Sequence, residues 1–136
     1  MNTFSSLLVA NRGEIASRIF KTAKKMGLKT IAIYTEADRH SPYVNDADSS
    51  VKIDSSYLDS EAIIAAAKLT GAQAIHPGYG FLSENHEFAN RVQNEGIIWV
   101  GPEPESIRIM GDKIEAKKHA VKSKIPILES VNDAKS

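Results

Sequence analysis

Residues 74–85 form the stretch of the chain best suited to building a binding surface. They read Ala-Ile-His-Pro-Gly-Tyr-Gly-Phe-Leu-Ser-Glu-Asn. Glycines on both sides of Tyr79 let the backbone approach a ligand closely, and the tyrosine ring offers a flat apolar wall. The loop of close approach comprises His76, Pro77, Gly78, Tyr79 and Gly80. The alternative is an ordinary Pro-Gly turn that only changes the direction of the chain.

Lys113 is a second candidate because its predicted position is unfavourable for a cation. Asp112, with Glu115 three residues later, has the form of a capping box and predicts that a helix begins there. Lys113 would then lie in the first turn, where the helix dipole disfavours a cation by roughly a few tenths of a kcal/mol. A lysine in that position is suited to binding an anion such as a phosphate. The alternative is a lysine that extends into solvent.

Residues 11–14 raise the question of a dinucleotide site, because they follow a predicted strand and open a helix. Glu36 or Asp38, after the next strand, would be the acid that binds the ribose. The dinucleotide fingerprint requires three glycines, however, and this turn contains Gly13 alone, with Glu14 at the phosphate position. These residues favour a plain strand-to-helix turn, and we expect no NAD binding.

Metal binding and nucleophilic catalysis are not indicated by the sequence. The chain has no cysteine, and its four histidines are scattered at positions 40, 76, 86 and 119. No spacing of histidines and carboxylates is typical of a metal site, so a structural hydrogen bond is the expected role of His76. The chain also contains no GxSxG elbow and no P-loop.

The composition is that of a water-soluble globular domain. The chain has 136 residues, 42% of them hydrophobic and 25% charged, and its net charge is zero. This balance gives no reason to expect binding to nucleic acid or to a membrane surface. No apolar run approaches the roughly 20 residues of a membrane span, and residues 1–6 do not form a secretory signal. A reducing aqueous compartment, the cytoplasm, is therefore the expected location.

Strands and helices alternate along the chain, which predicts an α/β fold with a mostly parallel sheet covered on both faces. The predicted strands span residues 7–10, 30–34, 51–53, 72–75, 97–100 and 125–128. The predicted helices span residues 14–26, followed by Gly27 as a C′ residue, a short segment from Pro42, and residues 60–70, capped by Asp59 or Ser60 and closed by Gly71. Further helices are predicted at residues 84–94 with Ser83 as N-cap, at residues 104–110 ended by Gly111, and at residues 113–123.

Three stretches in this order resemble the motifs of biotin carboxylases. The first is Leu-Val-Ala-Asn-Arg-Gly-Glu-Ile-Ala at residues 8–16, followed by Arg18, and the second is residues 74–85. The third combines Gly-Pro at 101–102, Ile-Arg at 107–108 and Met-Gly-Asp-Lys at 110–113. The resemblance extends over residues 6 to 128 and implies the Rossmann-like, three-layer domain with which these enzymes begin, called the pre-ATP-grasp domain.

The resemblance also implies a function. The family comprises acetyl-CoA, propionyl-CoA, methylcrotonyl-CoA, pyruvate and urea carboxylases, ligases that use MgATP and bicarbonate to carboxylate biotin on a carrier domain. By this resemblance Lys113 contacts the ATP phosphates, Tyr79 and Gly80 line the biotin end of the cleft, and Arg18 lies near a subunit interface. Lys21 and Lys25 replace an arginine and a glutamate of some bacterial members, so the bacterial form of the homodimer is not implied.

Much of the family enzyme lies outside this sequence. Residues 1–128 resemble the N-terminal domain and residues 129–136 the truncated start of the next segment, while the ATP-grasp and C-terminal domains are absent. We therefore expect no catalytic residue in this fragment and no activity without its partners: the ATP-grasp domain of the same chain, the biotin carboxyl carrier domain, and the carboxyltransferase domain or subunit. The mitochondrial matrix is the alternative location if the source is eukaryotic. The alternative function is a non-catalytic Rossmann-like module for assembly or carrier docking.

Overall fold

A single parallel sheet forms the centre of the computed structural model, which describes the backbone of residues 4–122 and the side chains of residues 4–114. Its strands lie side by side in the order β3-β2-β1-β4-β5. They are β1 (Ser6–Val9), β2 (Lys29–Tyr34), β3 (Ser49–Lys52), β4 (Ala74–His76) and β5 (Ile98–Trp99). All strand pairings are parallel, with Leu8 of β1 paired to Ile31 of β2 and to Ile75 of β4.

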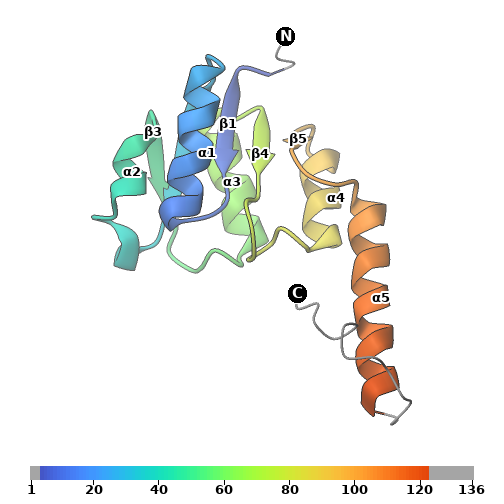
Figure 1. Ribbon diagram of the computed structural model, residues 1–136. Coiled ribbons are helices and arrows are strands. Elements are labelled where there is room, and N and C mark those ends of the chain that lie inside the picture. The colour runs from blue at the N-terminus through green and yellow to red at the C-terminus, as the bar shows by residue number, and fades with distance from the viewer. Residues whose placement is uncertain (1–3, 123–136) are drawn as a thin grey trace.

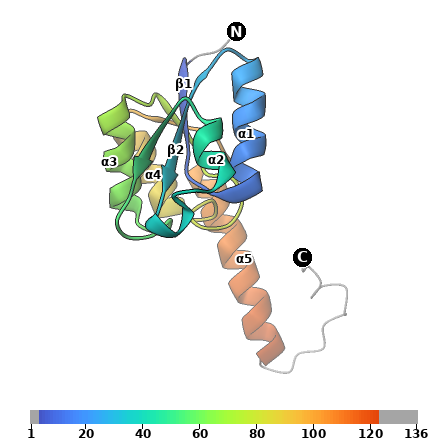
Figure 2. The same ribbon diagram turned by 90° about the vertical axis from the view of Figure 1, so that its left-hand side faces the viewer.

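Helices cover both faces of the sheet (Figure 1). They are α1 (Gly13–Lys25), the 3₁₀ helix η1 (Glu36–Asp38), α2 (Pro42–Asp46), α3 (Ser60–Thr70), α4 (His86–Asn94) and α5 (Pro104–Lys122). Figure 2 shows α1 and α2 on one side of the strands and α3 and α4 on the other. The structure therefore confirms the predicted α/β, Rossmann-like arrangement in three layers.

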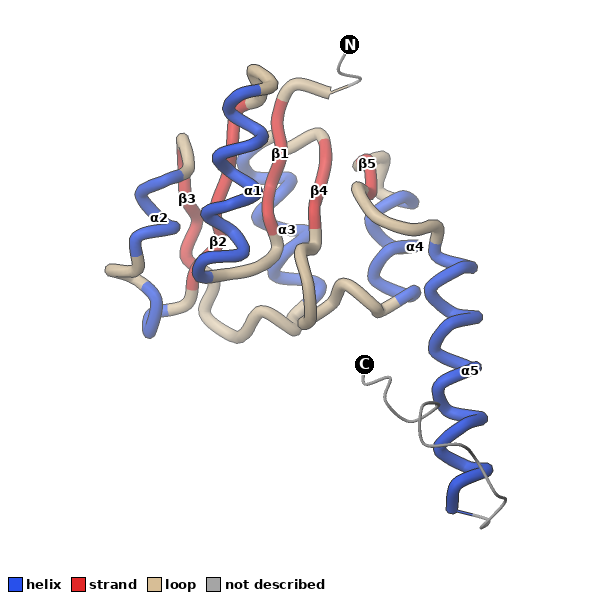
Figure 3. The backbone as a smooth tube through the Cα atoms, viewed as in Figure 1, coloured by secondary structure: helices blue, strands red, loops and turns tan. Residues whose placement is uncertain are grey.

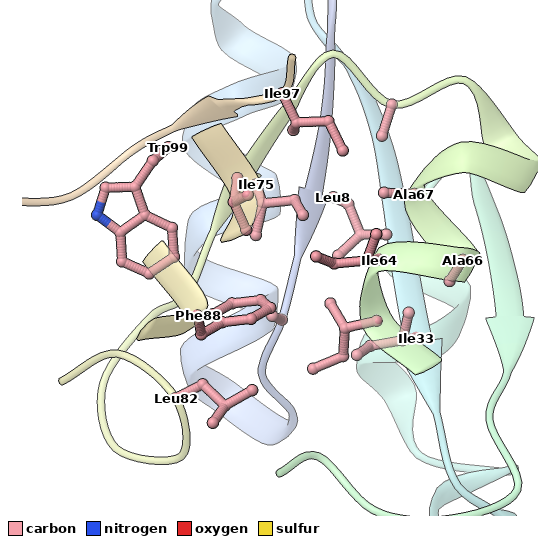
Figure 4. Packing of buried hydrophobic residues seen from close by; sticks show 14 of the residues in the cluster. Leu8, Ile33, Ile64, Ala66, Ala67, Ile75, Leu82, Phe88, Ile97 and Trp99 are labelled. Atoms are coloured by element: carbon pink, nitrogen blue, oxygen red, sulfur yellow. The ribbon is translucent and has the colours of Figure 1, made fainter. Parts of the chain in front are cut away.

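Alternating side chains of the strands build a core on each face of the sheet. Leu8 and Ile75 point toward α3 and α4, where they meet Ile64 of α3 and Phe88 of α4 (Figure 4). The Phe88 ring meets Trp99 edge to face, with ring centroids 5.7 Å apart. Leu7, Val9 and Ala74 point the other way and pack against α1 and α2, whose buried residues include Phe20 and Tyr43. Because both faces are covered, the central strands β1, β2 and β4 are mainly apolar, whereas the edge strand β3 alternates partly buried and exposed residues.

Local capping signals set several helix ends as predicted. The Asp59 side chain accepts a hydrogen bond from the backbone N–H of Ala62, at 3.1 Å, and so caps α3. Gly71 ends α3 in the left-handed conformation, with φ of 73°, and Gly27 follows α1 with φ of 81°. The predicted strands at 51–53 and 97–100 are present as β3 and β5, shifted or shortened by one to two residues. The segment 35–40, which lies outside every predicted strand and helix, contains η1.

The predicted N-cap of α4 is wrong. Asn85, not Ser83, caps this helix, because its side-chain oxygen accepts from the backbone N–H of Phe88 at 2.9 Å. The Ser83 N–H is itself bonded to the carbonyl of Gly80 at 2.9 Å, as part of turns that delay the start of the helix. Glu84 consequently precedes the helix rather than lying in its first turn.

The predicted helix break at Gly111 is also wrong. Helix α5 continues from Pro104 to Lys122, and the Asp112 side chain accepts from Arg108 at 2.7 Å instead of capping a new helix. A glycine inside a helix costs only about 1 kcal/mol relative to alanine, which the neighbouring ion pairs and the length of the helix offset. Lys113 therefore lies in the middle of a helix, and the dipole argument for an anion at its position no longer applies. The predicted strand at 125–128 lies outside the described residues.

No helix within residues 4–122 is both long enough and apolar enough to cross a membrane.

Candidate functional site

The strand order reverses between β1 and β4, and this point sets the place of the candidate site. The chain passes from β1 to β2 and β3 on one side, then returns to place β4 and β5 on the other side of β1. In open α/β sheets, ligands bind outside the carboxyl ends of the strands at such a switch point. The loop after β1 and the loop after β4 meet at this edge (Figure 3). The second of these loops contains the predicted residues 76–80.

Asn11, two residues after the end of β1, holds the loop after β4. Its side-chain amide nitrogen donates to the carbonyl of Pro77 at 2.9 Å and to that of Tyr79 at 2.6 Å. Its side-chain oxygen accepts from the backbone N–H of Arg12 at 2.8 Å. Asn11 is 1% exposed, so its side-chain amide forms these hydrogen bonds in place of hydrogen bonds to water. Buried bonds of this kind fix the path of the loop across the end of β1.

The glycines of the loop differ in what surrounds them. Gly78 has φ of 68°, and a Cβ atom added there would lie 2.6 Å from the amide nitrogen of Asn11. Gly80 has φ of 71°, but a Cβ atom there would meet nothing within 4 Å. Both positions favour glycine through their backbone conformation. Gly78 is required in addition for the close contact with Asn11, whereas Gly80 exposes its backbone to open space.

His76 stabilises the first turn of the loop. Its Nδ1 atom accepts from the backbone N–H of Gly78 at 3.0 Å. Burial lowers the pKa of the imidazole, because the charged form loses hydration. The ring is therefore neutral, and the accepting role of Nδ1 places its proton on Nε2.

Two aromatic residues of the loop have contrasting roles. Tyr79 is 77% exposed, so its ring is available to a ligand. Phe81 has φ of 46°, which is an unfavourable conformation for a residue with a side chain. The Phe81 ring packs against Tyr57 with centroids 5.3 Å apart. This contact helps to hold the strained residue in place.

An ionic cluster centred on the buried Asp38 carboxylate follows the end of β1. Arg12 donates to both oxygens of Asp38, at 2.6 Å each, and the hydroxyl of Tyr57 donates to the same carboxylate at 2.6 Å. The Tyr57 hydroxyl lies 2.7 Å from that of Tyr43, which donates to the carbonyl of Ile33. The Arg12 hydrogen bonds lower the pKa of Asp38 to about 2, although burial opposes the shift. Asp38, one of the two acids considered for a ribose, is therefore already bound within the protein, and Glu36, the other, is paired with Arg39 and Lys52.

Arg18 and Tyr79 line the same surface groove. This cavity of about 410 Å³ lies along α1 and the adjoining sheet edge. Its lining includes Ile15, Arg18, Ile19, His76, Tyr79 and Val100. The structure thus places the predicted interface residue beside the predicted ligand-facing loop. The groove is mainly apolar, which suits contact with another protein surface more than a charged ligand.

Lys113 belongs to a different element from the other candidates. It is exposed on α5 and forms no ion pair with any side chain that the structure describes. Helix α5 packs against α4 through its first turns, where Ile107 is buried, and then extends beyond the carboxyl edge of the sheet (Figures 1 and 2). The helix thus leaves the body on the side of the loop at 76–80, and the role of Lys113 stays a prediction. Among the described residues, no three histidine or acidic side chains are grouped to hold a metal ion.

Comparison with known proteins identifies the family. The sequence profile of the biotin carboxylase N-terminal domain matches residues 3–107. The chain belongs to this family. It is 51% identical over 128 residues to the mitochondrial propionyl-CoA carboxylase alpha chain of Sus scrofa and 54% identical over 115 residues to the biotin carboxylase of Allochromatium vinosum. These alignments span 90% and 81% of this chain but 18% and 26% of the two relatives.

A solved structure agrees with this assignment to the biotin carboxylase family. The pyruvate carboxylase of Rhizobium etli superimposes with a TM-score of 0.81 at 38% identity, over 94% of this chain and 14% of that enzyme. The chain thus corresponds to a small part of each of these larger proteins. The predicted resemblance and the predicted fold class are both confirmed.

Sequence reasoning missed three residues that hold the loop after β4: Asn11, Tyr57 and Phe81. Asn11 was considered only as part of a turn, because its bonding partners lie 66 and 68 residues further along the chain. The usable signal is a polar residue directly after the predicted strand 7–10, whose residues are all apolar. Phe81 and Tyr57 carried no local signal, because their role depends on a tertiary contact.

The two loop glycines provide a test of the close approach to Asn11. We expect Gly78→Ala to destabilise the chain by roughly 3 kcal/mol, since it adds an overlap with a buried hydrogen-bonded group to the cost of a left-handed alanine. The matched variant Gly80→Ala should cost about 1 kcal/mol, from backbone conformation alone. Urea unfolding followed by circular dichroism measures both. Equal losses for the two variants would contradict the packing described for Gly78.

The Asp38 cluster should make part of the stability depend on pH. The pKa of Asp38 is about 2 in the folded chain and 3.8 ordinarily, so its contribution is present above pH 4 and is lost as the pH falls through 2. Asp38→Asn should cost about 2 kcal/mol at pH 7. We expect the difference between the two proteins to shrink between pH 4 and pH 2. A difference that is the same at pH 7 and at pH 2 would show that Asp38 is not held as an anion.

Proposed function

We propose that this chain is the N-terminal domain of a biotin carboxylase, a ligase that uses MgATP and bicarbonate to carboxylate biotin on a carrier domain. The observation that carries the proposal is the family match over residues 3–107 together with the position of its loop, residues 76–80, at the switch point of the sheet. The chain would supply one wall of the cleft for ATP and biotin. The remaining walls would come from the ATP-grasp part of the enzyme.

The exposed loop fits a ligand such as biotin. Tyr79 offers an exposed ring to the apolar part of such a ligand. Gly80 has open space around its backbone, so the polar edge of the ligand can reach the backbone there. The neutral His76 and the bonds from Asn11 keep this surface fixed before a ligand arrives. In this proposal Tyr79 and Gly80 face biotin, while His76, Pro77 and Gly78 have a structural role.

Phosphoryl transfer requires more than the described residues supply. Metal ions and donors around the γ-phosphate stabilise the charge that is transferred in such reactions. Lys113 is an exposed cation that could contact ATP phosphates, but the described residues form no acidic group for magnesium. We therefore assign ATP contact to Lys113 and no catalytic residue to this chain, and we expect the chain to be inactive alone.

The partners follow from the same proposal. The ATP-grasp domain, the biotin carboxyl carrier domain and the carboxyltransferase domain or subunit would complete the reaction. Relatives named for different acceptors, propionyl-CoA and pyruvate, each match most of this chain. The carboxyltransferase part, and not this domain, would therefore determine the final acceptor. Arg18 would lie near a homodimer interface, and the compartment would be the cytoplasm, or the mitochondrial matrix in a eukaryote.

A second candidate function is a non-catalytic module for assembly or for docking of a carrier domain. The apolar groove beside α1 favours it, because Ile15, Ile19 and Val100 present a surface suited to another protein. The two functions differ in one observable: only the first makes this chain necessary for bicarbonate-dependent ATP cleavage.

A domain exchange tests the proposed function. We expect residues 1–128 of this chain to restore biotin- and bicarbonate-dependent ATP cleavage when they replace the matching segment of the Allochromatium vinosum enzyme. The chain alone should show no such turnover. A soluble, folded chimera without activity would contradict the proposal, and so would clear turnover by the isolated chain.

Lys113 is tested in the same chimera. Lys113→Ala should raise the KM for ATP at least about tenfold, which corresponds to about 1.4 kcal/mol, and leave the KM for biotin unchanged. The matched variant Lys25→Ala removes an exposed lysine at the end of α1 and should change neither constant. If the KM for ATP stays the same in Lys113→Ala, Lys113 does not contact the nucleotide.

A further inference from the structure

The loop that carries Tyr79 cannot hold its conformation by itself. Three of its residues have positive φ: Gly78, Gly80 and Phe81. This conformation is easy for glycine but is strained for Phe81, which has a side chain. Within the loop, the backbone N–H of Gly78 bonds to the His76 ring and that of Ser83 to the carbonyl of Gly80. These bonds close its two turns but do not tie the loop to the sheet. Beyond Phe81 the buried Leu82 packs into the core, and Asn11, in the turn after β1, ties residues 77–79 to the sheet.

Two separate contacts connect that turn to the loop. Asn11 donates to the carbonyls of Pro77 and Tyr79 on the first side of the loop. On the second side, Phe81 packs on Tyr57, whose hydroxyl donates to the carboxylate that Arg12 also binds. The neighbours Asn11 and Arg12 therefore fix both sides of the loop, and Tyr79 and Gly80 lie between the two contacts.

We propose that Asn11 is a positioning residue for biotin, because its two hydrogen bonds set where the Tyr79 ring and the Gly80 backbone lie. This inference rests on the proposed function. Asn11 is buried and touches the loop rather than the ligand, so it acts through Tyr79 and Gly80. A loop that is free to move would have to be ordered at each binding event, which weakens affinity.

The chemistry of the site selects an amide. Two carbonyl oxygens converge on one nitrogen, which must donate to both, while the side-chain oxygen accepts from the N–H of Arg12. An aspartate keeps the size and the bond to Arg12, but it turns a carboxylate oxygen toward two carbonyls. The loss of both bonds and the repulsion should release the loop.

The chain contains a matched control at Asn85. There the side-chain oxygen alone is used, as acceptor from Phe88 N–H, and aspartate caps a helix as well as asparagine does. Asn85→Asp therefore makes the same chemical change without removing a donor. Asn11→Ala is a second variant, which removes the donors without adding charge and serves if Asn11→Asp does not fold.

The first measurement is amide hydrogen exchange of the 136-residue chain by NMR. Asn11→Asp, or Asn11→Ala, should speed the exchange of the Gly78 amide at least tenfold more than Asn85→Asp does, at conditions where the amides of β1 and β2 still exchange slowly. If the Gly78 amide exchanges at the same rate in the Asn11 and Asn85 variants, Asn11 does not order the loop and the proposal is overturned.

The second measurement uses the chimeric enzyme. The Asn11 variants should raise the KM for free biotin at least tenfold and change the KM for ATP less than twofold, whereas Asn85→Asp should change neither. A general loss of stability would lower activity without separating the two constants, so equal changes in both overturn the proposal. If the chimera without any substitution at Asn11 is inactive, the proposed function is overturned, and with it the role of Asn11 in biotin binding. The exchange rates then still decide whether Asn11 orders the loop.

Discussion

The hydrogen bonds from the Asn11 side chain to the carbonyls of Pro77 and Tyr79 are the constraint on which the candidate site depends. They join the end of β1 to the end of β4 at the point where the strand order reverses. A parallel sheet brings these ends together but does not specify the loops that follow them. One buried amide supplies that specification, and Gly78 is needed because any larger residue would occupy the same space.

The surroundings of Asn11 make this constraint rigid. Arg12 is bound to Asp38, Asp38 to Tyr57, and Tyr57 packs on Phe81, so the chain of contacts returns to the loop from its other side. The left-handed Phe81 is unfavourable in isolation and persists because these neighbours hold it. The same cluster occupies Asp38, one of the two acids considered for a dinucleotide ribose. Asp38 thus supports the ligand-facing loop through Tyr57 and Phe81 instead of facing a ligand itself.

Sequence reasoning reached the parts of the structure that depend on local patterns. The alternation of apolar strands with amphipathic helices predicted the fold, and Asp59 and Gly71 marked the ends of α3 correctly. It failed where two local signals competed: Ser83 and Asn85 both suit an N-cap, and the turns after Phe81 select Asn85. The predicted helix break at Gly111 is wrong because the ion pairs of Arg108 with Glu105 and Asp112 stabilise a helix that continues through the glycine.

The loop itself was found from its residue types, because two glycines around a tyrosine indicate close approach wherever they lie. Asn11 could not be found in this way, since its partners are distant in sequence and asparagine and glycine are ordinary residues of a turn. Lys113 lies inside a continuous helix and not at a helix end, so its predicted role depends on the family resemblance and on its exposed position on α5. Long-range pairing, rather than composition, separates the residues found from those missed.

The most direct measurement of the central claim is the exchange rate of the Asn11 side-chain amide protons in the chain, followed by NMR. Both protons are bound to backbone carbonyls in a buried site, so we expect them to exchange at least tenfold more slowly than those of Asn90, whose side chain lies on the exposed part of α4. Exchange of the Asn11 protons at the rate of Asn90 would show that the loop is not held from the end of β1, and the account of the site would be wrong.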